Sequence, residues 1–255
     1  MFYRLQPFLF FFVLAPYGFA KPLVDVVREL KPSIVGVGFK VPLATVENQL
    51  VGTGFVVGNG KYIVTNEHVI NAEHPHEEKF HRVIFVRDGN VYTTIPIRDV
   101  FVHDKYDIAI ARIDAELPAV DLYTSMESVD DGTTIAITGY PIGAVLGLYP
   151  ATHKGIVAAR TPNIKPAQHS SEMSSTFLAR LNDPLMVYQL DIVAYPGNSG
   201  SPVYVADSGE VFGVVNKVFV KETKEAVLSN PSGITYAIPI VEVLNLARQH
   251  GIELQ

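Results

Sequence analysis

Ser199 stands in a Gly-Asn-Ser-Gly turn between two extended apolar runs, where its hydroxyl could act as a nucleophile. A serine hydroxyl attacks a carbonyl only when a base takes its proton and hydrogen-bond donors hold the oxyanion that forms. His68, directly after the apolar run 62–64, is a candidate base. Asp107, at the head of the apolar run 108–110, is a candidate for orienting the imidazole. Together the three residues predict covalent acyl transfer.

Each of these residues also has an ordinary structural explanation. A serine between glycines is commonly a turn residue, a histidine at a strand end is commonly structural, and an aspartate before an apolar run is often a cap. Their occurrence in the order His68, Asp107, Ser199 favours catalysis, because it is the order of the chymotrypsin-type triad and differs from that of subtilisins and α/β-hydrolases. Asp104 is a rival acid, but Asp107 directly precedes the apolar strand and is preferred.

Residues 1–20 are typical of a cleaved export signal. The basic residue Arg4 precedes the apolar stretch 8–14, and Gly18 and Ala20 are small residues at the positions that a signal peptidase reads. An uncleaved N-terminal anchor is the alternative, and only in that case would the protein contact a membrane, although the apolar stretch is short for a span. We therefore expect a protein exported to a bacterial periplasm or secreted.

The composition narrows the compartment and the partners. The 255-residue chain has a formal charge of −6 and no cysteine. An acidic chain without a basic cluster argues against nucleic acid as a partner. Without cysteine its stability cannot depend on disulfides, which fits a bacterial envelope or secreted protein. We expect protein or peptide substrates and no cofactor, and a homo-oligomer remains open.

Residues 71–82 contain side chains of the kinds that bind metal ions. The potential ligands are His74, His76, His81, Glu73, Glu77 and Glu78. No expected strand or helix holds these side chains in place, and their spacing matches no standard zinc site. We predict a solvated loop and no metal site.

Alternating apolar patterns separated by turn residues predict many short strands. The expected strands are 33–41, 51–57, 61–65, 83–87, 91–100, 108–110, 133–139, 152–159, 186–193, 203–205, 209–220 and 233–238. Gly58-Asn59-Gly60 is expected to close a hairpin, because Asn-Gly with positive φ suits a tight turn. Helices are expected at 22–30 and 239–250. This pattern predicts an all-β barrel or sandwich.

Two longer polar segments interrupt the strands. Residues 118–131 are expected to connect two lobes, at about 33–117 and 132–238, because proline, serine and acidic residues replace the strand pattern there. Residues 160–184 form a long polar segment with room for a short helix near 176–181. A loop of this length inside a β protein is more often functional than filler.

The motifs around the three candidate residues resemble those of the protease domain of HtrA (DegP-like) serine endopeptidases. Thr65-Asn66-Glu67-His68-Val69-Ile70 is similar to their T-N-x-H-V motif, Asp107-Ile108-Ala109-Ile110 to D-I-A-L, and Gly197-Asn198-Ser199-Gly200 to G-N-S-G. Further matches are Gly52-Thr53-Gly54-Phe55, Gly155-Ile156-Val157 and Gly233-Ile234-Thr235-Tyr236-Ala237-Ile238-Pro239. The resemblance covers most of residues 23–250 in the family's order.

This resemblance implies a chymotrypsin-like fold of two six-stranded β-barrels over residues 21–255, with short N- and C-terminal helices, and serine endopeptidase activity. It implies that Ser199 is the nucleophile, His68 the base and Asp107 the orienting acid. The oxyanion hole is expected in the turn Gly197-Asn198-Ser199, with the backbone N–H groups of Gly197 and Ser199 as donors. Most such proteases carry PDZ domains after the protease domain, and we expect none before the end at Gln255.

The expected substrate-binding residues are Val193, Ala194 and Asn216. In chymotrypsin-type enzymes the residue six before the nucleophile, here Val193, largely sets the base of the primary pocket. Its apolar surface predicts cleavage after small or medium aliphatic residues. Asp191, two residues earlier, leaves a partly acidic pocket open. A non-cleaving polypeptide binder and an esterase of small acyl substrates are the alternative functions.

Overall fold

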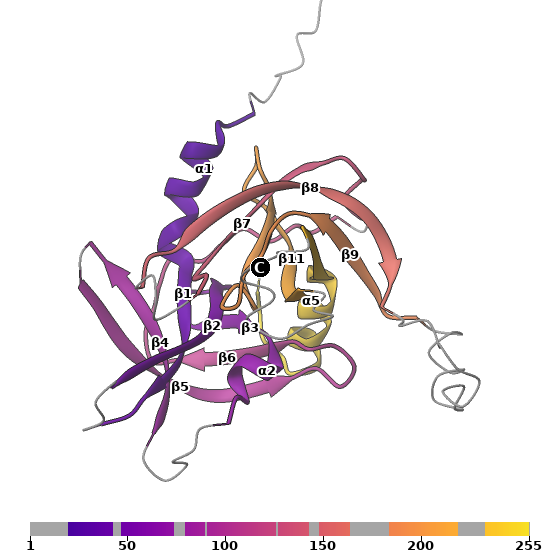
Figure 1. Cartoon of the computed structure of the whole chain (residues 1–255). Helices are drawn as coiled ribbons and strands as arrows, with labels where there is room; N and C mark the ends of the chain where they lie inside the picture. The colour runs from indigo at the N-terminus through magenta and orange to yellow at the C-terminus, as the bar shows by residue number, and fades with distance from the viewer. Residues whose placement is uncertain are drawn as a thin grey trace, which may run out of the picture.

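Twelve strands close into two six-stranded antiparallel barrels in the part of the chain that the structure describes (Figure 1). The computed structural model describes residues 20–42, 47–73, 80–89, 91–125, 127–142, 148–163, 184–218 and 233–254. Residues 1–19 of the expected signal, residues 74–79 of the histidine-rich segment and the expected helix near 176–181 lie outside these ranges.

The first barrel is built from the N-terminal half of the chain. Its strands are β1 (Ile34–Lys40), β2 (Asn48–Val57), β3 (Tyr62–Thr65), β4 (His81–Asp88), β5 (Val91–Val102) and β6 (Ala109–Ile113). They pair in the order β1-β2-β3-β6-β5-β4. The β2–β3 hairpin turns where expected, but its left-handed residues are Gly58 and Gly60, with φ of 60° and 82°.

The second barrel follows the connection at residues 118–131. Its strands are β7 (Thr134–Gly139), β8 (Ala151–Pro162), β9 (Met186–Asp191), β10 (Pro202–Val205), β11 (Val211–Val218) and β12 (Ile234–Pro239). They pair in the order β10-β11-β12-β9-β8-β7. Strand β8 runs three residues past the expected end at Ala159, whereas β9 ends two residues before Val193.

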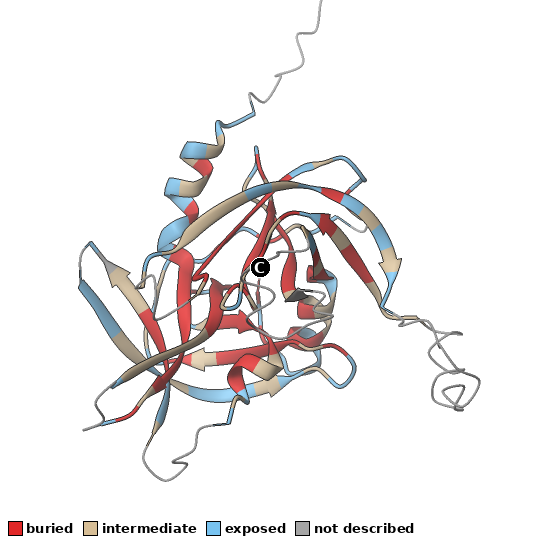
Figure 2. Ribbon diagram, in the orientation of Figure 1, coloured by how far each residue is buried: buried red, intermediate tan, exposed pale blue. Residues whose placement is uncertain are grey.

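The buried apolar side chains form three cores, and successive side chains of a strand can face different cores. One fills the first barrel, one fills the second, and one lies between the barrels and the terminal helices. In β2, Val56 faces the interior of the first barrel, while Phe55 and Val57 face the core between the barrels. Successive strand side chains point to opposite faces, so a strand buried on both sides serves two cores at once. Figure 2 shows this burial along the inner strands of both barrels.

The terminal helices close the core between the barrels. They are α1 (Leu23–Leu30), followed by a 3₁₀ turn at Lys31–Ser33, and α5 (Ile240–Gln249). Helix α1 contributes Val26 and Leu30 to this core, and α5 contributes Val243 and Leu246. Within the described ranges no helix has the length and apolar character needed to span a membrane.

The all-β class, the two six-stranded barrels and the helices at the ends are confirmed. The pattern did not predict the one-turn helix α2 (Glu67–Ile70), which follows β3 directly. Four residues are too few for a helical period to show in a sequence pattern.

Candidate active site

His68 and Asp107 are brought together by the pairing of β3 with β6. Thr65 of β3 pairs with Ala109 of β6, so the residues just beyond these strand ends, on α2 and in the bend before β6, become neighbours. The Asn66 side-chain amide fastens the bend by donating to the Asp107 carbonyl at 2.8 Å.

The Asp107 carboxylate holds the His68 ring in one orientation. Its Oδ2 lies 2.6 Å from the ring Nδ1, and its Oδ1 accepts the backbone N–H of His68 at 2.9 Å. A carboxylate accepts hydrogen bonds, so Nδ1 carries the shared proton and Nε2 is left as the proton acceptor. The two side chains are 35% and 23% exposed, so the pair lies at the protein surface and within reach of a ligand.

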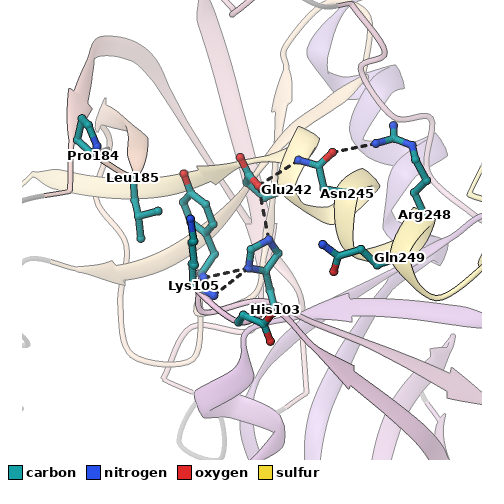
Figure 3. Close-up of a pocket in the computed structure, with 10 residues that line it drawn as sticks. His103, Lys105, Pro184, Leu185, Glu242, Asn245, Arg248 and Gln249 are labelled. Carbon is teal, nitrogen blue, oxygen red and sulfur yellow. Dashed lines mark hydrogen bonds and ion pairs between the residues drawn. The ribbon is translucent and has the colours of Figure 1, made fainter. Parts of the chain in front are cut away.

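Asp104 does not take this place. It is exposed in the bend between β5 and β6, and it lines a cleft of about 510 Å³ between that bend, helix α5 and residues 184–185 (Figure 3). The carboxylate that lies at the imidazole is therefore that of Asp107.

His103 organises the bend that carries Asp107, a role that sequence reasoning missed. Its Nδ1 accepts the backbone N–H groups of Lys105 and Tyr106, both at 3.1 Å. Its Nε2 faces Glu242 Oε2 of α5 at 3.6 Å, as Figure 3 shows. The sequence indicated only a polar bend here, and no spacing rule connects residue 103 with residue 242.

Ser199 lies beside the helix that carries His68. A Cβ added to Gly52 would lie 2.7 Å from the side chain of Val69 and 3.0 Å from the Ser199 carbonyl. This glycine is therefore packed between the residue after His68 and the turn Gly197-Asn198-Ser199-Gly200, named the nucleophile turn after its candidate nucleophile. The Ser199 hydroxyl donates to the Asn216 carbonyl of β11 at 3.4 Å. That contact is long, and a serine hydroxyl turns readily about its Cβ.

Two backbone N–H groups of the nucleophile turn are directed away from bonded carbonyls. The Pro196 carbonyl accepts the Ile142 N–H at 2.6 Å, and the Asn198 carbonyl accepts the Ser201 N–H at 3.0 Å. In a trans peptide the N–H points opposite to the carbonyl, so the N–H groups of the following residues, Gly197 and Ser199, point the other way. Neither N–H donates a hydrogen bond to another described residue.

Position 197 requires a glycine, because of its backbone conformation and the close approach of a neighbouring carbonyl. Its φ is 98°, and a Cβ at this position would lie 2.3 Å from the Tyr140 carbonyl. Asn198, which the sequence placed with it in the oxyanion hole, donates its own N–H to the Tyr195 carbonyl at 3.0 Å. The available donors are therefore the amides of Gly197 and Ser199, and the Asn198 amide is not one of them.

Two of the expected substrate-binding residues, Val193 and Ala194, follow the end of β9 rather than lying within it, whereas Asn216 lies in β11. Val193 is half-buried and Ala194 is buried in the core of the second barrel. Asp191 is exposed and pairs with Ile156 on one side and Ile234 on the other. The strand alternation that linked Asp191 to Val193 therefore does not extend to Val193, because the strand has already ended.

His153 of β8 lies next to the segment that leads into the nucleophile turn. Its ring packs against Tyr195 at 5.9 Å between centroids, and its Nε2 is buried without a hydrogen-bond partner among the described residues. Burial lowers the pKa of His153 below its usual 6.5. Burial also raises the pKa of Tyr140, at the end of β7, to about 12.

Only part of the expected histidine-rich segment is described. His81 begins β4, while His74, His76, Glu77 and Glu78 lie outside the described residues. Elsewhere in the described ranges no group of three or more His, Cys, Asp or Glu side chains is arranged to hold a metal ion.

Comparison with known proteins finds related sequences. Residues 52–214 match the family described as trypsin-like peptidase domain. The chain is 28% identical over 204 residues to a probable periplasmic serine endoprotease DegP-like of Halomonas elongata, covering 80% of this chain and 35% of that one. It is 29% identical over 234 residues to serine protease HTRA1B of Danio rerio, covering 89% and 41%.

Solved structures share the fold. The serine endoprotease of Yersinia pestis superposes with a TM-score of 0.60 at 22% identity, covering 90% of this chain and 66% of that one. Deg5 superposes with a TM-score of 0.58 at 22% identity, covering 87% and 90%. The chain spans well under half the length of the curated relatives named above.

Proposed function

Because this chain belongs to the trypsin-like peptidase domain family, we propose that it is an exported serine endopeptidase with Ser199 as nucleophile, His68 as base and Asp107 as orienting acid. The proposal rests on two contacts of the Asp107 carboxylate: Oδ2 lies 2.6 Å from the His68 ring Nδ1, and Oδ1 accepts the His68 backbone N–H at 2.9 Å. These contacts leave the imidazole Nε2 as the proton acceptor. The helix that carries His68 is packed beside the nucleophile turn.

The reaction begins when the Ser199 hydroxyl leaves the Asn216 carbonyl and attacks the carbonyl carbon of the scissile peptide bond. His68 Nε2 takes the hydroxyl proton, and Asp107 stabilises the imidazolium that forms. The substrate oxygen becomes an oxyanion that accepts the N–H groups of Gly197 and Ser199. Loss of one such donor typically lowers turnover by about 10²–10³-fold, so the anchoring of these peptides matters for rate.

The second half of the reaction returns the enzyme to its starting state. The tetrahedral intermediate expels the amine, which takes the proton from His68, and an acyl ester remains on Ser199. Water then gives a proton to His68 and attacks the ester carbonyl, which forms a second tetrahedral intermediate. This intermediate releases the acid product as its bond to Ser199 breaks, and the serine oxygen takes the proton back from His68. All protons pass through one imidazole, so no cofactor is needed.

The proposed substrates are unfolded or exposed polypeptides, cut after small or medium aliphatic residues. Curated relatives are named periplasmic serine endoproteases, which supports an exported protein acting on polypeptide. The half-buried Val193 provides apolar surface for a side chain of this kind, and the buried Ala194 packs in the barrel core behind it.

A fluorophosphonate probe tests the proposal directly. The purified protein and its Ser199→Ala variant are treated with the probe and, separately, with an unfolded protein and an ester substrate. We expect labelling and cleavage by the wild type alone, with equal thermal stability of the two proteins, because the turn hydroxyl contributes little packing. An unlabelled wild type that binds polypeptide without cutting it would establish a non-cleaving binder, and turnover of the ester alone would establish an esterase.

A further inference from the structure

We propose that Thr53 is a positioning residue for the nucleophile turn, because its hydroxyl holds the Gly197 carbonyl and so maintains the orientation of the oxyanion-binding amides. The inference rests on the function proposed above and deepens it. Thr53 lies on β2 in the first barrel, whereas the turn that it holds belongs to the second.

The side chain and the backbone of Thr53 both contact the turn. The hydroxyl donates to the Gly197 carbonyl at 2.7 Å, and the Thr53 backbone N–H donates to the Ser199 carbonyl at 2.9 Å. Thr53 is fully buried, at 0% exposure, so its two donor groups are shielded from water. The first barrel is therefore hydrogen-bonded to the turn on both sides of Asn198, at the carbonyls of Gly197 and Ser199.

The direction of the hydroxyl proton follows from its second contact. Thr53 Oγ1 lies 3.0 Å from the backbone N of Tyr140, which can only donate. A hydroxyl has one proton, so with an amide already donating to its oxygen that proton is free for the Gly197 carbonyl. The hydroxyl thus joins two backbone groups that do not bond to each other.

Both peptides that flank Gly197 depend on the hydrogen bonds of the Thr53 hydroxyl. The carbonyl of Gly197 itself accepts the Thr53 hydroxyl directly, and the carbonyl of the preceding residue, Pro196, accepts the Ile142 N–H. Ile142 is two residues from Tyr140, whose N–H is held by Thr53. The Pro196 carbonyl shares a peptide with the Gly197 N–H and sets its direction. Glycine alone would rotate widely about φ and ψ, so the bond to the Gly197 carbonyl restricts movement of the next peptide relative to this one.

Ile142 needs such support because its own backbone conformation is unfavourable. Its φ is 55°, in the left-handed region that a β-branched residue rarely adopts. A strained backbone persists only where surrounding contacts maintain it. The hydrogen bonds of Tyr140 to Thr53 and of Ile142 to Pro196 are contacts of this kind.

Three variants separate the hydroxyl from the shape of the side chain. Thr53→Val keeps the shape and removes the hydrogen bonds, Thr53→Ser keeps the hydroxyl, and Thr53→Cys substitutes a thiol, which is a weak donor. Thr235→Val is the matched control: Thr235 is equally buried, and its hydroxyl donates to the Ile192 carbonyl at the same 2.7 Å, away from the Gly197 carbonyl.

The readouts are kcat and KM on a peptide substrate, the affinity for a peptide boronate and the melting temperature. The tetrahedral boronate places an oxygen where the oxyanion forms, so its affinity reports the two amides. We expect Thr53→Val to lower kcat and boronate affinity together, by about tenfold or more, with KM within about twofold of the wild type. Thr53→Ser should stay within about threefold of the wild type, and Thr53→Cys should fall between the two.

Thr235→Val should lower the melting temperature as much as Thr53→Val does, while its kcat and boronate affinity stay at the wild-type level. Wild-type kcat in Thr53→Val, or equal loss of kcat in the two valine variants, would overturn the positioning role. If Thr53→Val does not fold, wild-type kcat in Thr53→Cys would overturn it instead. A wild type that does not react with the boronate or the peptide would refute the proposed function, a different outcome.

Discussion

The Asp107 carboxylate binds His68 at two points, the ring Nδ1 and the backbone N–H. His68 is the second residue of the one-turn helix α2, whose N-cap residue, Asn66, makes no side-chain cap bond. The carboxylate therefore satisfies a free N–H at the start of the helix while it orients the ring. The proposed acid fixes both the imidazole and the backbone that carries it.

Asp107→Asn should lower kcat by about 10⁴-fold at neutral pH, because the amide donates to Nδ1 and favours the wrong histidine tautomer. Steady-state kinetics on a peptide substrate measures this loss. Asp104→Asn is the control and should keep wild-type kcat, since Asp104 is exposed away from the imidazole. A larger loss in Asp104→Asn would show that the acid has been misassigned.

Val193→Asp should shift cleavage toward Lys and Arg, because a carboxylate at the base of the pocket pairs with a cationic side chain. The measurement is the sequence of new termini produced from an unfolded protein by wild type and variant. Asp191→Asn, on the exposed outer face, should leave the wild-type pattern of aliphatic cuts unchanged. If the wild type cuts mainly after Lys or Arg and Asp191→Asn abolishes this, the pocket is acidic after all.

His153 should make the protein less stable in mild acid. Its pKa in the folded state is lowered by burial, so below about pH 6.5 the unfolded chain binds a proton that the folded protein resists. The free energy of unfolding therefore falls as the pH drops from 6.5 through the folded-state pKa. His153→Phe keeps an aromatic ring against Tyr195 and removes the titration. Urea unfolding at pH 7.5 and pH 5 should show a smaller decrease for the variant, and equal decreases would contradict the assignment.

Gly139→Ala should destabilise the junction of the two barrels. A Cβ there would lie 2.0 Å from Ser201 Oγ and 2.9 Å from both Asn198 Oδ1 and Thr53 Oγ1. We expect a loss of about 1–3 kcal/mol in the free energy of unfolding, together with reduced kcat, because the displaced groups belong to or hold the nucleophile turn. Gly213→Ala, whose Cβ would meet nothing nearer than 3.2 Å, should cost less. Denaturant titration of both variants decides the comparison, and equal losses would argue against a tight junction.

Export should remove residues 1–20 and leave a mature chain that begins at Lys21. The backbone N of Lys21 donates to the Asp207 carbonyl at 3.1 Å, two residues before α1, so the new terminus would lie close to this contact. Intact-mass measurement of the protein from the periplasm or medium tests this. A mass that includes residues 1–20 would favour the anchored alternative.

Local chemistry was enough to predict the all-β class and to select the residues of the candidate site. Strand alternation and glycine turns are visible within ten residues, and the settings of His68, Asp107 and Ser199 are recognisable within six. The pairing of Thr65 with Ala109 follows from closing a barrel, and it brings His68 and Asp107 together although they are 39 positions apart.

Only the tertiary structure decided which groups hold those residues in place. Thr53 and Gly197 are 144 positions apart, and although Gly52-Thr53-Gly54-Phe55 is one of the matched motifs, the motif does not indicate which group the Thr53 hydroxyl contacts. The left-handed Ile142 and the approach of His103 Nε2 to Glu242 cannot be found in the sequence either, because each is maintained by contacts between segments that meet only after both barrels have closed. A side chain's type is local information, whereas its hydrogen-bond partner depends on the packing of the whole chain.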